Sequence, residues 1–329
     1  MRQVTNFKEN IPHIGLMGTP FSPEQVALLR ELVASRGYAL TNLTELSEPE
    51  AILPYCEILC GYFSKGQLQQ AQQLRWLQLP CAGADRYAAE ELYPHPGVVL
   101  TNSSGAFGAA IAEQLLMGSL MLLRRMPEYQ RQQREKIWRR VGPLRFLRGS
   151  LVTVLGTGNL GGTFAKYCRS LGATVRGVSR SGNPREDFDQ VYPVERLKEA
   201  VAGSDIVAAC LPLTGQTLGL IDKDVFDAME AETIFLNAGR GKTVVQQDLI
   251  DALRQGRICG AMLDVAEEEP MPPDCPLWDM EQVIITPHVS GSDLDADNAA
   301  VIFEIFQDNL ERYFAGRPLR NVVDKTKGY

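Results

Sequence analysis

Residues 151–161, LVTVLGTGNLG, decide how this chain of 329 residues folds. The first half is an apolar, β-branched run, which is typical of a buried parallel strand. Gly156, Gly158 and Gly161 follow in the spacing G-x-G-x-x-G, and a helix pattern opens at Gly162. A dinucleotide pyrophosphate requires a tight turn, a backbone without a Cβ atom, and the free N–H groups of a helix N-terminus. The stretch therefore predicts a dinucleotide site, with an ordinary glycine-rich turn as the alternative.

Length and charge limit the kinds of protein that this chain can be. A chain of this length is expected to form about two domains, because one core rarely grows past about 250–300 residues. The formal net charge of −7 does not indicate a nucleic-acid or anionic-membrane partner. The longest strongly apolar run, residues 115–123, is too short to span a bilayer, and residues 1–10 contain no apolar signal core. We therefore expect a cytoplasmic protein.

The 7 cysteines are scattered, odd in number and mostly placed in apolar stretches. This is the pattern of buried free thiols in a reducing compartment. It does not fit a disulfide framework or a zinc site, and we expect no metal.

The first hundred residues alternate short apolar strands with helical patterns, which predicts a small domain with a parallel sheet. A helix is predicted to start at the Ser22-Pro23 pair, because Pro after a Ser cap is a favourable first helical residue, and to end near residue 37. A second helix is predicted over residues 65–74. The predicted strands are residues 13–17, 57–61, 76–79 and 98–101.

Residues 80–85, PCAGAD, follow one of these strands directly. Ligands of open α/β sheets lie beyond the carboxyl ends of the strands. The backbone N–H groups of Ala82 and Gly83 are therefore candidates for binding a carboxylate, with a plain strand–helix turn as the alternative.

Apolar residues lie on almost every face of residues 106–123, which predicts a helix that is buried all round. A charged amphipathic stretch follows, and we expect a helical arm over residues 126–148 that carries Trp138 and Phe146. Such an arm has no core of its own to cover. We therefore expect it to pack on a partner subunit in a homodimer.

The second βα series begins at the glycine fingerprint and predicts a Rossmann-type sheet. Its predicted strands are residues 151–155, 174–179, 206–211, 233–237, 260–265 and 283–286, and a last helix is predicted over about 294–314. We expect an α/β fold of two domains. Residues 102–293 form the doubly wound dinucleotide-binding domain, and residues 1–101 with 294–329 form a smaller flavodoxin-like substrate domain completed by the C-terminal helix.

The tip of the second Rossmann strand reads Ser179-Arg180-Ser181. A site for NAD usually carries Asp or Glu here, which holds the ribose hydroxyls. A guanidinium and two hydroxyls instead suit the 2′-phosphate of NADP(H). The alternative is that Arg180 is a solvated surface charge.

Three later strand ends carry candidate catalytic residues. Arg240, in NAGRG, lies between glycines and can hold a 2-oxo acid through two parallel hydrogen bonds to its carboxylate. Glu267-Glu268-Glu269 would normally be a solvated loop. His288 follows an apolar strand, and His is the side chain suited to deliver a proton near neutral pH. His13, in a predicted strand, and His95, between two prolines, are the alternatives.

With these motifs in order, the sequence resembles the D-isomer-specific 2-hydroxyacid dehydrogenase family over essentially the whole chain. The matching motifs are the fingerprint at 156–161, LPLT at 211–214, NAGRG at 237–241, LDVAEEEP at 263–270 and TPH at 286–288, with TNSSG at 101–105, AE at 112–113 and NVVD at 321–324.

The resemblance implies roles for particular residues. Arg240 would bind the substrate carboxylate and carbonyl, and His288 would act as the acid or base. Glu269 would orient His288, because the orienting acid of the family lies just before the Pro of this motif. Asp264 would contact the nicotinamide amide, and residues 82–83 the substrate carboxylate.

The resemblance also implies a cofactor site that departs from the commoner family pattern. Ser179-Arg180 replaces the usual acid and resembles the NADPH-using glyoxylate/hydroxypyruvate reductases, whereas Ala266 replaces a more usual aromatic residue. The expected cofactor contacts are Gly156, Thr157, Gly158, Asn159, Leu160, Gly161, Ser179, Arg180, Ser181, Leu211, Pro212, Thr214, Ala238, Arg240, Asp264, His288 and Ser290.

The expected function is transfer of hydride from NADP(H) to a small 2-oxo acid, with the active site in the cleft between the domains. An NAD(H)-linked dehydrogenase is the alternative among enzymes. Formate oxidation is disfavoured by the carboxylate at residue 269, and phosphite oxidation by the lack of Lys in residues 80–85. A dinucleotide-sensing scaffold, as in the corepressors of the family, is the alternative from another class.

Overall fold

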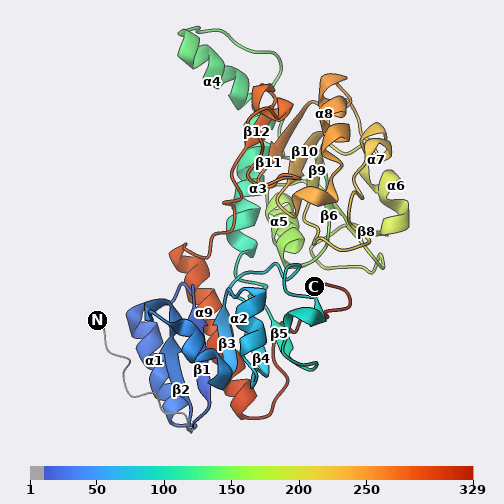
Figure 1. Cartoon of the computed structure of the whole chain (residues 1–329). Coiled ribbons are helices and arrows are strands. Elements are labelled where there is room, and N and C mark those ends of the chain that lie inside the picture. The colour runs from blue at the N-terminus through green and yellow to red at the C-terminus, as the bar shows by residue number, and fades with distance from the viewer. Residues whose placement is uncertain (1–10, 329) are drawn as a thin grey trace. The chain divides into compact units, whose positions relative to one another are not determined.

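A computed structural model describes residues 11–328, so residues 1–10, on which the expectation of a missing signal core rests, lie outside the described residues. The chain divides into two compact units (Figure 1): unit 1 is Met1–Ala106 with Asp293–Tyr329, and unit 2 is Phe107–Ser292. The boundary expected after residue 101 lies later, because residues 102 and 103 hydrogen-bond to unit 1. Within residues 11–328 no helix is long and apolar enough to cross a membrane.

Unit 1 contains a parallel sheet of five strands in the order β2-β1-β3-β4-β5, which is the flavodoxin-like order that was expected. The edge strand β2 was not predicted, since only one of its four residues is buried and the alternation signal is therefore weak. The strands are β1 His13–Met17, β2 Ala39–Asn42, β3 Cys56–Gly61, β4 Trp76–Gln78 and β5 Val99–Thr101.

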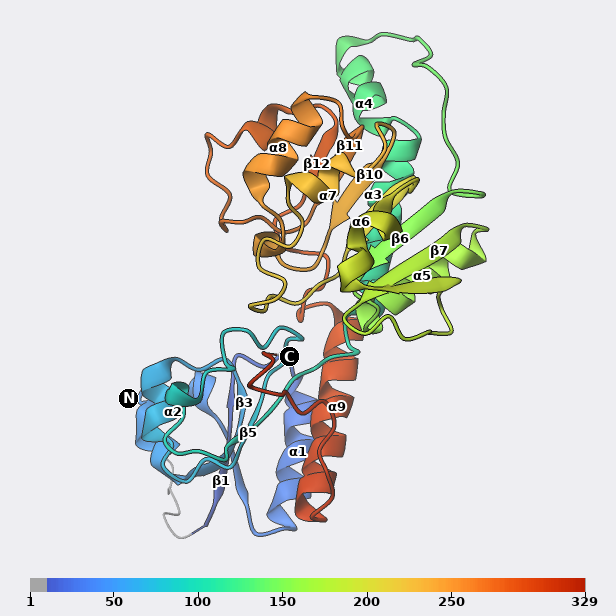
Figure 2. The same ribbon diagram turned by 90° about the vertical axis from the view of Figure 1, so that its right-hand side faces the viewer.

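Helices cover both faces of the unit 1 sheet. Figure 2 shows α1 (Pro23–Ala34) and α9 (Ala296–Phe314) along one face, where both contribute to one apolar cluster with β1 and β3. The helix α1 begins with the predicted cap, since Ser22 and Gln25 form a capping box. On the other face α2 (Lys65–Gln70) is shorter than predicted, because Ala71 leaves the helical conformation.

Unit 2 contains a parallel sheet of seven strands in the order β12-β11-β10-β9-β6-β7-β8, which confirms the Rossmann-type prediction. The edge strand β8 was missing from the predicted series, because its sequence QVYP ends in Pro and buries only Tyr192. The strands are β6 Leu151–Leu155, β7 Thr174–Ser179, β8 Gln190–Pro193, β9 Ile206–Ala209, β10 Ile234–Asn237, β11 Gly260–Leu263 and β12 Val283–Ile285.

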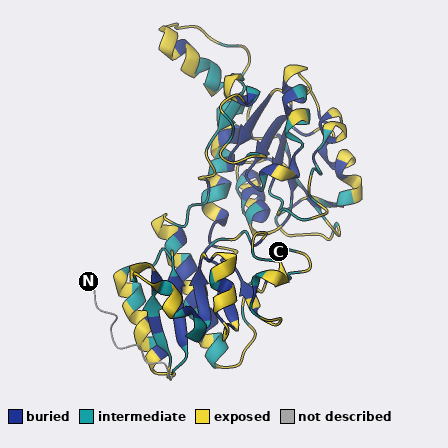
Figure 3. Cartoon of the chain, in the orientation of Figure 1, coloured by how far each residue is buried: buried dark blue, intermediate teal, exposed yellow. Residues whose placement is uncertain are grey.

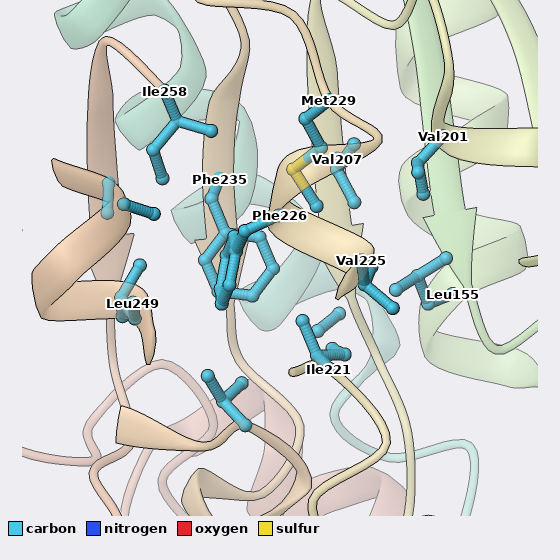
Figure 4. Packing of buried hydrophobic residues seen from close by; sticks show 14 of the residues in the cluster. Leu155, Val201, Val207, Ile221, Val225, Phe226, Met229, Phe235, Leu249 and Ile258 are labelled. Carbon is cyan, nitrogen blue, oxygen red and sulfur yellow. The ribbon is translucent and has the colours of Figure 1, made fainter. Parts of the chain in front are cut away.

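Helices also cover both faces of the unit 2 sheet. The helices α3 (Gly108–Leu123) and α5 (Asn159–Ser170) cover one face. The helices of the other face are α6 Leu197–Val201, α7 Lys223–Asp227 and α8 Gln246–Arg254. Figure 4 shows this second core, in which Phe226 of α7 meets Phe235 of β10 edge to face, with 5.4 Å between ring centroids. The helices packed on both faces hold the strands of this sheet in place, and the candidate site lies at the ends of these strands.

Two expectations for residues 106–148 are wrong. The helix α3 is not buried all round, because Met117 and Leu120 are exposed. The arm is helical only over α4 (Met126–Glu135), since Lys136 takes a left-handed backbone conformation with φ 57° that ends the helix. Figure 3 shows α4 and the loop after it as mostly exposed, and Trp138 is fully exposed.

Candidate active site

The glycine fingerprint forms the turn between β6 and α5. Gly156 has φ +101°, and a Cβ atom there would lie 2.6 Å from the carbonyl oxygen of Cys210. A Cβ on Gly161 would overlap the Gly156 carbonyl, whereas one on Gly158 would meet nothing within 4 Å. The helix α5 begins at Asn159, three residues earlier than predicted, and no side chain caps its N-terminus. These residues fit a pyrophosphate, since open space faces the free N–H groups of a helix start.

Glycines also pack the neighbouring strand ends together around Arg240. A Cβ on Gly239 would lie 2.7 Å from the Leu211 carbonyl oxygen, and a Cβ on Gly241 would overlap the carbonyl oxygen of Ala266. The ends of β9, β10 and β11 therefore approach one another backbone to backbone. Removal from water raises the pKa of the nearby Cys210 thiol to about 12, so this side chain stays neutral.

Arg240 is half-buried and held at its backbone. Its carbonyl oxygen accepts hydrogen bonds from Thr243 Oγ1 at 2.7 Å and Asn237 Nδ2 at 3.4 Å. Its Nη1 donates to the Gly239 carbonyl oxygen at 2.9 Å. The guanidinium therefore stays at the carboxyl edge of the sheet, where a bidentate contact with a carboxylate can form.

Asp264, at the end of β11, anchors the loop after β12. The residue is only 3% exposed. Its Oδ1 accepts hydrogen bonds from Thr286 Oγ1 at 2.6 Å and Val289 N at 3.0 Å. Its Oδ2 accepts from Ser290 N at 3.1 Å and from Ser290 Oγ. A carboxylate offers about four lone-pair positions. The expected contact with a nicotinamide amide would therefore require one of these donors to be released.

His288 stands in the middle of this anchored loop. Its backbone N–H donates to the Asp264 carbonyl oxygen at 2.8 Å, and its φ is 53°. Its Nδ1 lies 2.8 Å from Oε2 of Glu269, whose Oε1 accepts from Ala266 N at 3.1 Å. The two side chains are 49% and 38% exposed, so the pair is open to a ligand. Glu269, which precedes Pro270, is thus the member of the acidic run that faces His288.

The other two histidines lie in unit 1. His13 is buried in β1. His95 lies in an exposed loop, with Nδ1 3.1 Å from the carbonyl oxygen of Pro96.

In unit 1, the loop after β4 has an asymmetric pattern of hydrogen bonds. The carbonyl oxygens of residues 81, 82 and 83 accept from Ser103 N, Asn102 Nδ2 and Cys81 Sγ, respectively. Among the described residues, nothing accepts from the N–H groups of Ala82 and Gly83. A turn with occupied carbonyls and free N–H groups is suited to bind an anion.

The first residues of the loop after β7 form local turns. Ser179 Oγ accepts from Gly182 N at 3.1 Å, and Ser181 Oγ accepts from Asn183 N at 3.5 Å. Arg180 is exposed and forms no hydrogen bond or ion pair with any residue that the structure describes. Both serine hydroxyl hydrogens and the guanidinium are therefore available to a phosphate group.

The remaining expected cofactor residues lie on the same edge of the unit 2 sheet. Thr214 N donates to Thr217 Oγ1 at 2.8 Å, and Thr217 Oγ1 donates to the Pro212 carbonyl oxygen at 2.6 Å, which closes the loop after β9. The others are Thr157, Asn159 and Leu160 at the start of α5, Leu211 after β9, Ala238 after β10, and Ser290 after β12.

Comparison with known proteins gives a family match. The sequence model of the family "D-isomer specific 2-hydroxyacid dehydrogenase, NAD binding domain" matches residues 116–290. Glyoxylate/hydroxypyruvate reductase A of Arabidopsis thaliana is 33% identical over 230 residues, 69% of this chain and 71% of that protein. An uncharacterised protein of Corynebacterium melassecola is 32% identical over 178 residues, 54% of this chain and 58% of that protein.

Solved structures resemble the chain over nearly its whole length. An NADPH-dependent glyoxylate/hydroxypyruvate reductase from Sinorhizobium meliloti, solved with NADP and sulfate, has a TM-score of 0.83 at 28% identity and covers 97% of this chain and 100% of that one. A D-isomer specific 2-hydroxyacid dehydrogenase family protein from Aeromonas salmonicida has a TM-score of 0.82 at 31% identity and covers 96% and 100%.

Proposed function

This chain belongs to the D-isomer specific 2-hydroxyacid dehydrogenase family, and from that premise we propose that it reduces a small 2-oxo acid to a D-2-hydroxy acid with NADPH. The observation that carries the proposal is the His288–Glu269 pair, 2.8 Å apart, in a loop anchored by buried Asp264. Reduction of a carbonyl requires a fixed proton donor, and a solvated surface histidine would not need this anchor.

Different residues of the chain bind the substrate and deliver the proton to it. Arg240 binds the carboxylate and carbonyl through its fork, and the N–H groups of Ala82 and Gly83 bind the carboxylate as well. Since Nδ1 of His288 faces Glu269, Nε2 carries the proton to the carbonyl oxygen. Glu269 stabilises the imidazolium and orients the ring. The cofactor, when bound, supplies the hydride.

We propose that the cofactor is NADPH rather than NADH. The support is the exposed Arg180 between two serines, with no acid at the strand tip. The Sinorhizobium meliloti structure described above contains NADP, which agrees with this assignment. An acid at this position would repel the 2′-phosphate, whereas a guanidinium attracts it.

We also propose that the protein works as a homodimer in the cytoplasm. An apolar groove with a volume of about 720 Å³ lies between α3 and the start of α4, where Leu116, Met117, Leu120 and Met121 line it. Exposed apolar surface of this kind marks an interaction site.

The 7 cysteines are all free thiols, which fits a reducing compartment such as the cytoplasm.

A substrate panel tests the proposed activity. Glyoxylate, hydroxypyruvate, pyruvate and larger 2-oxo acids are each supplied with NADPH and with NADH. The chirality of the product is determined for every substrate except glyoxylate, because its product, glycolate, is achiral. We expect turnover of at least one small 2-oxo acid. Glycolaldehyde, which lacks the carboxylate, is the matched control, and we expect it to react about 100-fold less efficiently because the positioning contacts are lost. No turnover with any 2-oxo acid would contradict the proposal and favour the sensing scaffold.

A further inference from the structure

Two separate hydrogen bonds fix the direction of the free N–H groups after β4. In a trans peptide, the carbonyl of one residue and the N–H of the next lie in one plane and point opposite ways. Ser103 N holds the Cys81 carbonyl at 3.0 Å, which aims the Ala82 N–H. Asn102 Nδ2 holds the Ala82 carbonyl at 2.7 Å, which aims the Gly83 N–H. Asn102 and Ser103 therefore orient both N–H groups that are proposed to bind the carboxylate.

Asn102 is itself held by Asn321, which comes 219 residues later in the chain. Asn321 Nδ2 donates to the Asn102 carbonyl oxygen at 3.2 Å and to the Ser104 carbonyl oxygen at 2.8 Å. In return, the Asn102 N–H donates to the Asn321 carbonyl oxygen at 3.2 Å. Both N–H donors of the Asn321 side chain are thus used on the segment that orients the loop.

The backbone of Asn321 is adapted to this position. Its φ is 54°, a left-handed conformation that Asn tolerates better than most residues. The side chain of Asn102 is closed on the other side by Ser104, whose N–H donates to Asn102 Oδ1 at 3.1 Å. The Asn102 amide therefore has little freedom to turn away from Ala82.

The C-terminal segment does not depend on Asn321 for its attachment. Val323 N donates to the Leu100 carbonyl oxygen at 2.8 Å, and Val322 bridges Thr101. Lys325 Nζ lies 3.1 Å from Glu90 Oε2. With the segment already attached in this way, the two hydrogen bonds from the Asn321 amide are available to hold Asn102 in position.

We propose that Asn321, acting through Asn102, is a positioning residue for substrate binding: it holds the loop so that the Ala82 and Gly83 N–H groups face the substrate carboxylate. This inference rests on the proposed function, because it requires a carboxylate-bearing substrate. Neither asparagine touches the reacting atoms. Their loss should weaken recognition of the carboxylate while binding of NADPH is unchanged.

The test compares two variants in the full chain. Asn321→Gly keeps the left-handed conformation and removes the amide, and Asn102→Ala removes the donor to Ala82. For each we expect the KM for glyoxylate to rise about 10-fold or more, with the KM for NADPH unchanged, because the carboxylate contacts are misplaced. The double variant should raise the KM for glyoxylate no further than Asn102→Ala alone does, because Asn321 is proposed to act only through Asn102.

Lys325→Met is the matched control in the same segment. It removes the ion pair with Glu90 and is expected to lower Tm without changing the KM for glyoxylate. If Asn321→Gly and Asn102→Ala lower Tm and also leave this KM unchanged, their role is structural and the inference is wrong. Should Asn321→Gly fail to fold, Asn102→Ala carries the same test. A wild-type protein that neither reduces any 2-oxo acid nor binds oxalate would overturn the proposed function itself, before any variant is compared.

Discussion

The loop after β12 and the loop after β7 leave the same edge of one sheet, yet the chain holds them very differently. The loop that carries His288 donates four hydrogen bonds to the buried carboxylate of Asp264. In the loop that carries Arg180, the described hydrogen bonds of residues 180–183 are two local turn contacts, and the Arg180 side chain is exposed. Only the later part of this loop is attached, through the hydrogen bond from Arg169 Nη1 to the Glu186 carbonyl oxygen and the buried side chain of Phe188.

The difference follows from what each loop is proposed to do. Proton transfer requires a donor within hydrogen-bond distance of one atom, so a small displacement is costly. Attraction between a guanidinium and a phosphate decreases slowly with distance and tolerates movement. We therefore expect changes in the His288 loop to abolish turnover, whereas changes in the Arg180 loop should alter only the choice of cofactor.

The largest effect is expected for His288→Ala. General acid catalysis is typically worth about 10²–10⁴ in rate, so we expect kcat to fall at least about 100-fold. Binding of NADPH, measured by fluorescence titration, should persist. Near-normal turnover at neutral pH would remove His288 from the mechanism.

Arg240→Lys comes next, because it keeps the charge and loses the fork. We expect the KM for a 2-oxo acid to rise sharply and kcat to fall as the carbonyl is misplaced, with a combined loss in kcat/KM of about 100-fold. Steady-state kinetics with glyoxylate measure both parameters. An unchanged KM for the 2-oxo acid would mean that Arg240 does not hold the carboxylate.

Asp264→Asn tests the anchor of the His288 loop directly. The amide offers one acceptor oxygen and turns two N–H donors toward groups that also donate, so the loop must shift. We expect kcat to fall by about 10- to 100-fold through displacement of His288. Ser290→Ala, which removes only one of the four hydrogen bonds, serves as the graded comparison. Its kcat should lie between the values for the wild type and for Asp264→Asn. Full activity of Asp264→Asn would show that the loop needs no anchor.

A smaller effect is expected for substitutions in the loop that carries Arg180. We expect NADPH to be preferred over NADH by at least about 10-fold in kcat/KM, and less so as salt concentration rises, since a hydrogen bond to a charged group is worth about 10-fold or more. Ser179→Asp with Arg180→Ala should erase most of that preference and leave kcat with NADH nearly intact. Arg185→Ala, which removes an exposed charge from the same loop, is the control. Equal use of both cofactors by the parent protein would leave Arg180 as a surface charge.

The smallest effect on the chemistry is expected from assembly. We expect light scattering at micromolar concentration to give the mass of a homodimer, because two-fold pairing is the commonest way to cover an apolar face. Met117→Lys with Leu120→Lys should give monomers. A monomer mass for the parent protein would contradict the assembly.

The sequence predicts the features that depend on neighbouring residues. The fingerprint predicts the strand–turn–helix at residues 151–170, and the Ser22-Pro23 pair predicts the start of α1. Short edge strands are harder to predict, because β2 and β8 bury one residue each and carry little alternation. The end of α4 depends on one left-handed residue in an otherwise helical pattern.

In the candidate site, too, the sequence predicts the features that lie within single motifs and not those that depend on distant segments. Motif order predicts the candidate residues Arg240, Glu269 and His288, and the structure brings the last two within hydrogen-bond distance. The four donors to Asp264 and the pairing of Asn102 with Asn321 arise only when distant segments meet in the fold. The only sequence signal for that pairing was the presence of both residues in family-like motifs, TNSSG and NVVD.

The discontinuous unit 1 has a consequence for the order in which the protein is made. Its helix α9 supplies Phe306 and Leu310 to the core against β1 and β3, and these residues leave the ribosome long after the strands that they cover. Unit 2 is one continuous segment and can fold as soon as it emerges, since domains generally fold as units during synthesis. Until α9 is made, the first strands of the chain therefore have this face covered by α1 alone, and a nascent chain halted before α9 should be a target for chaperones and proteases.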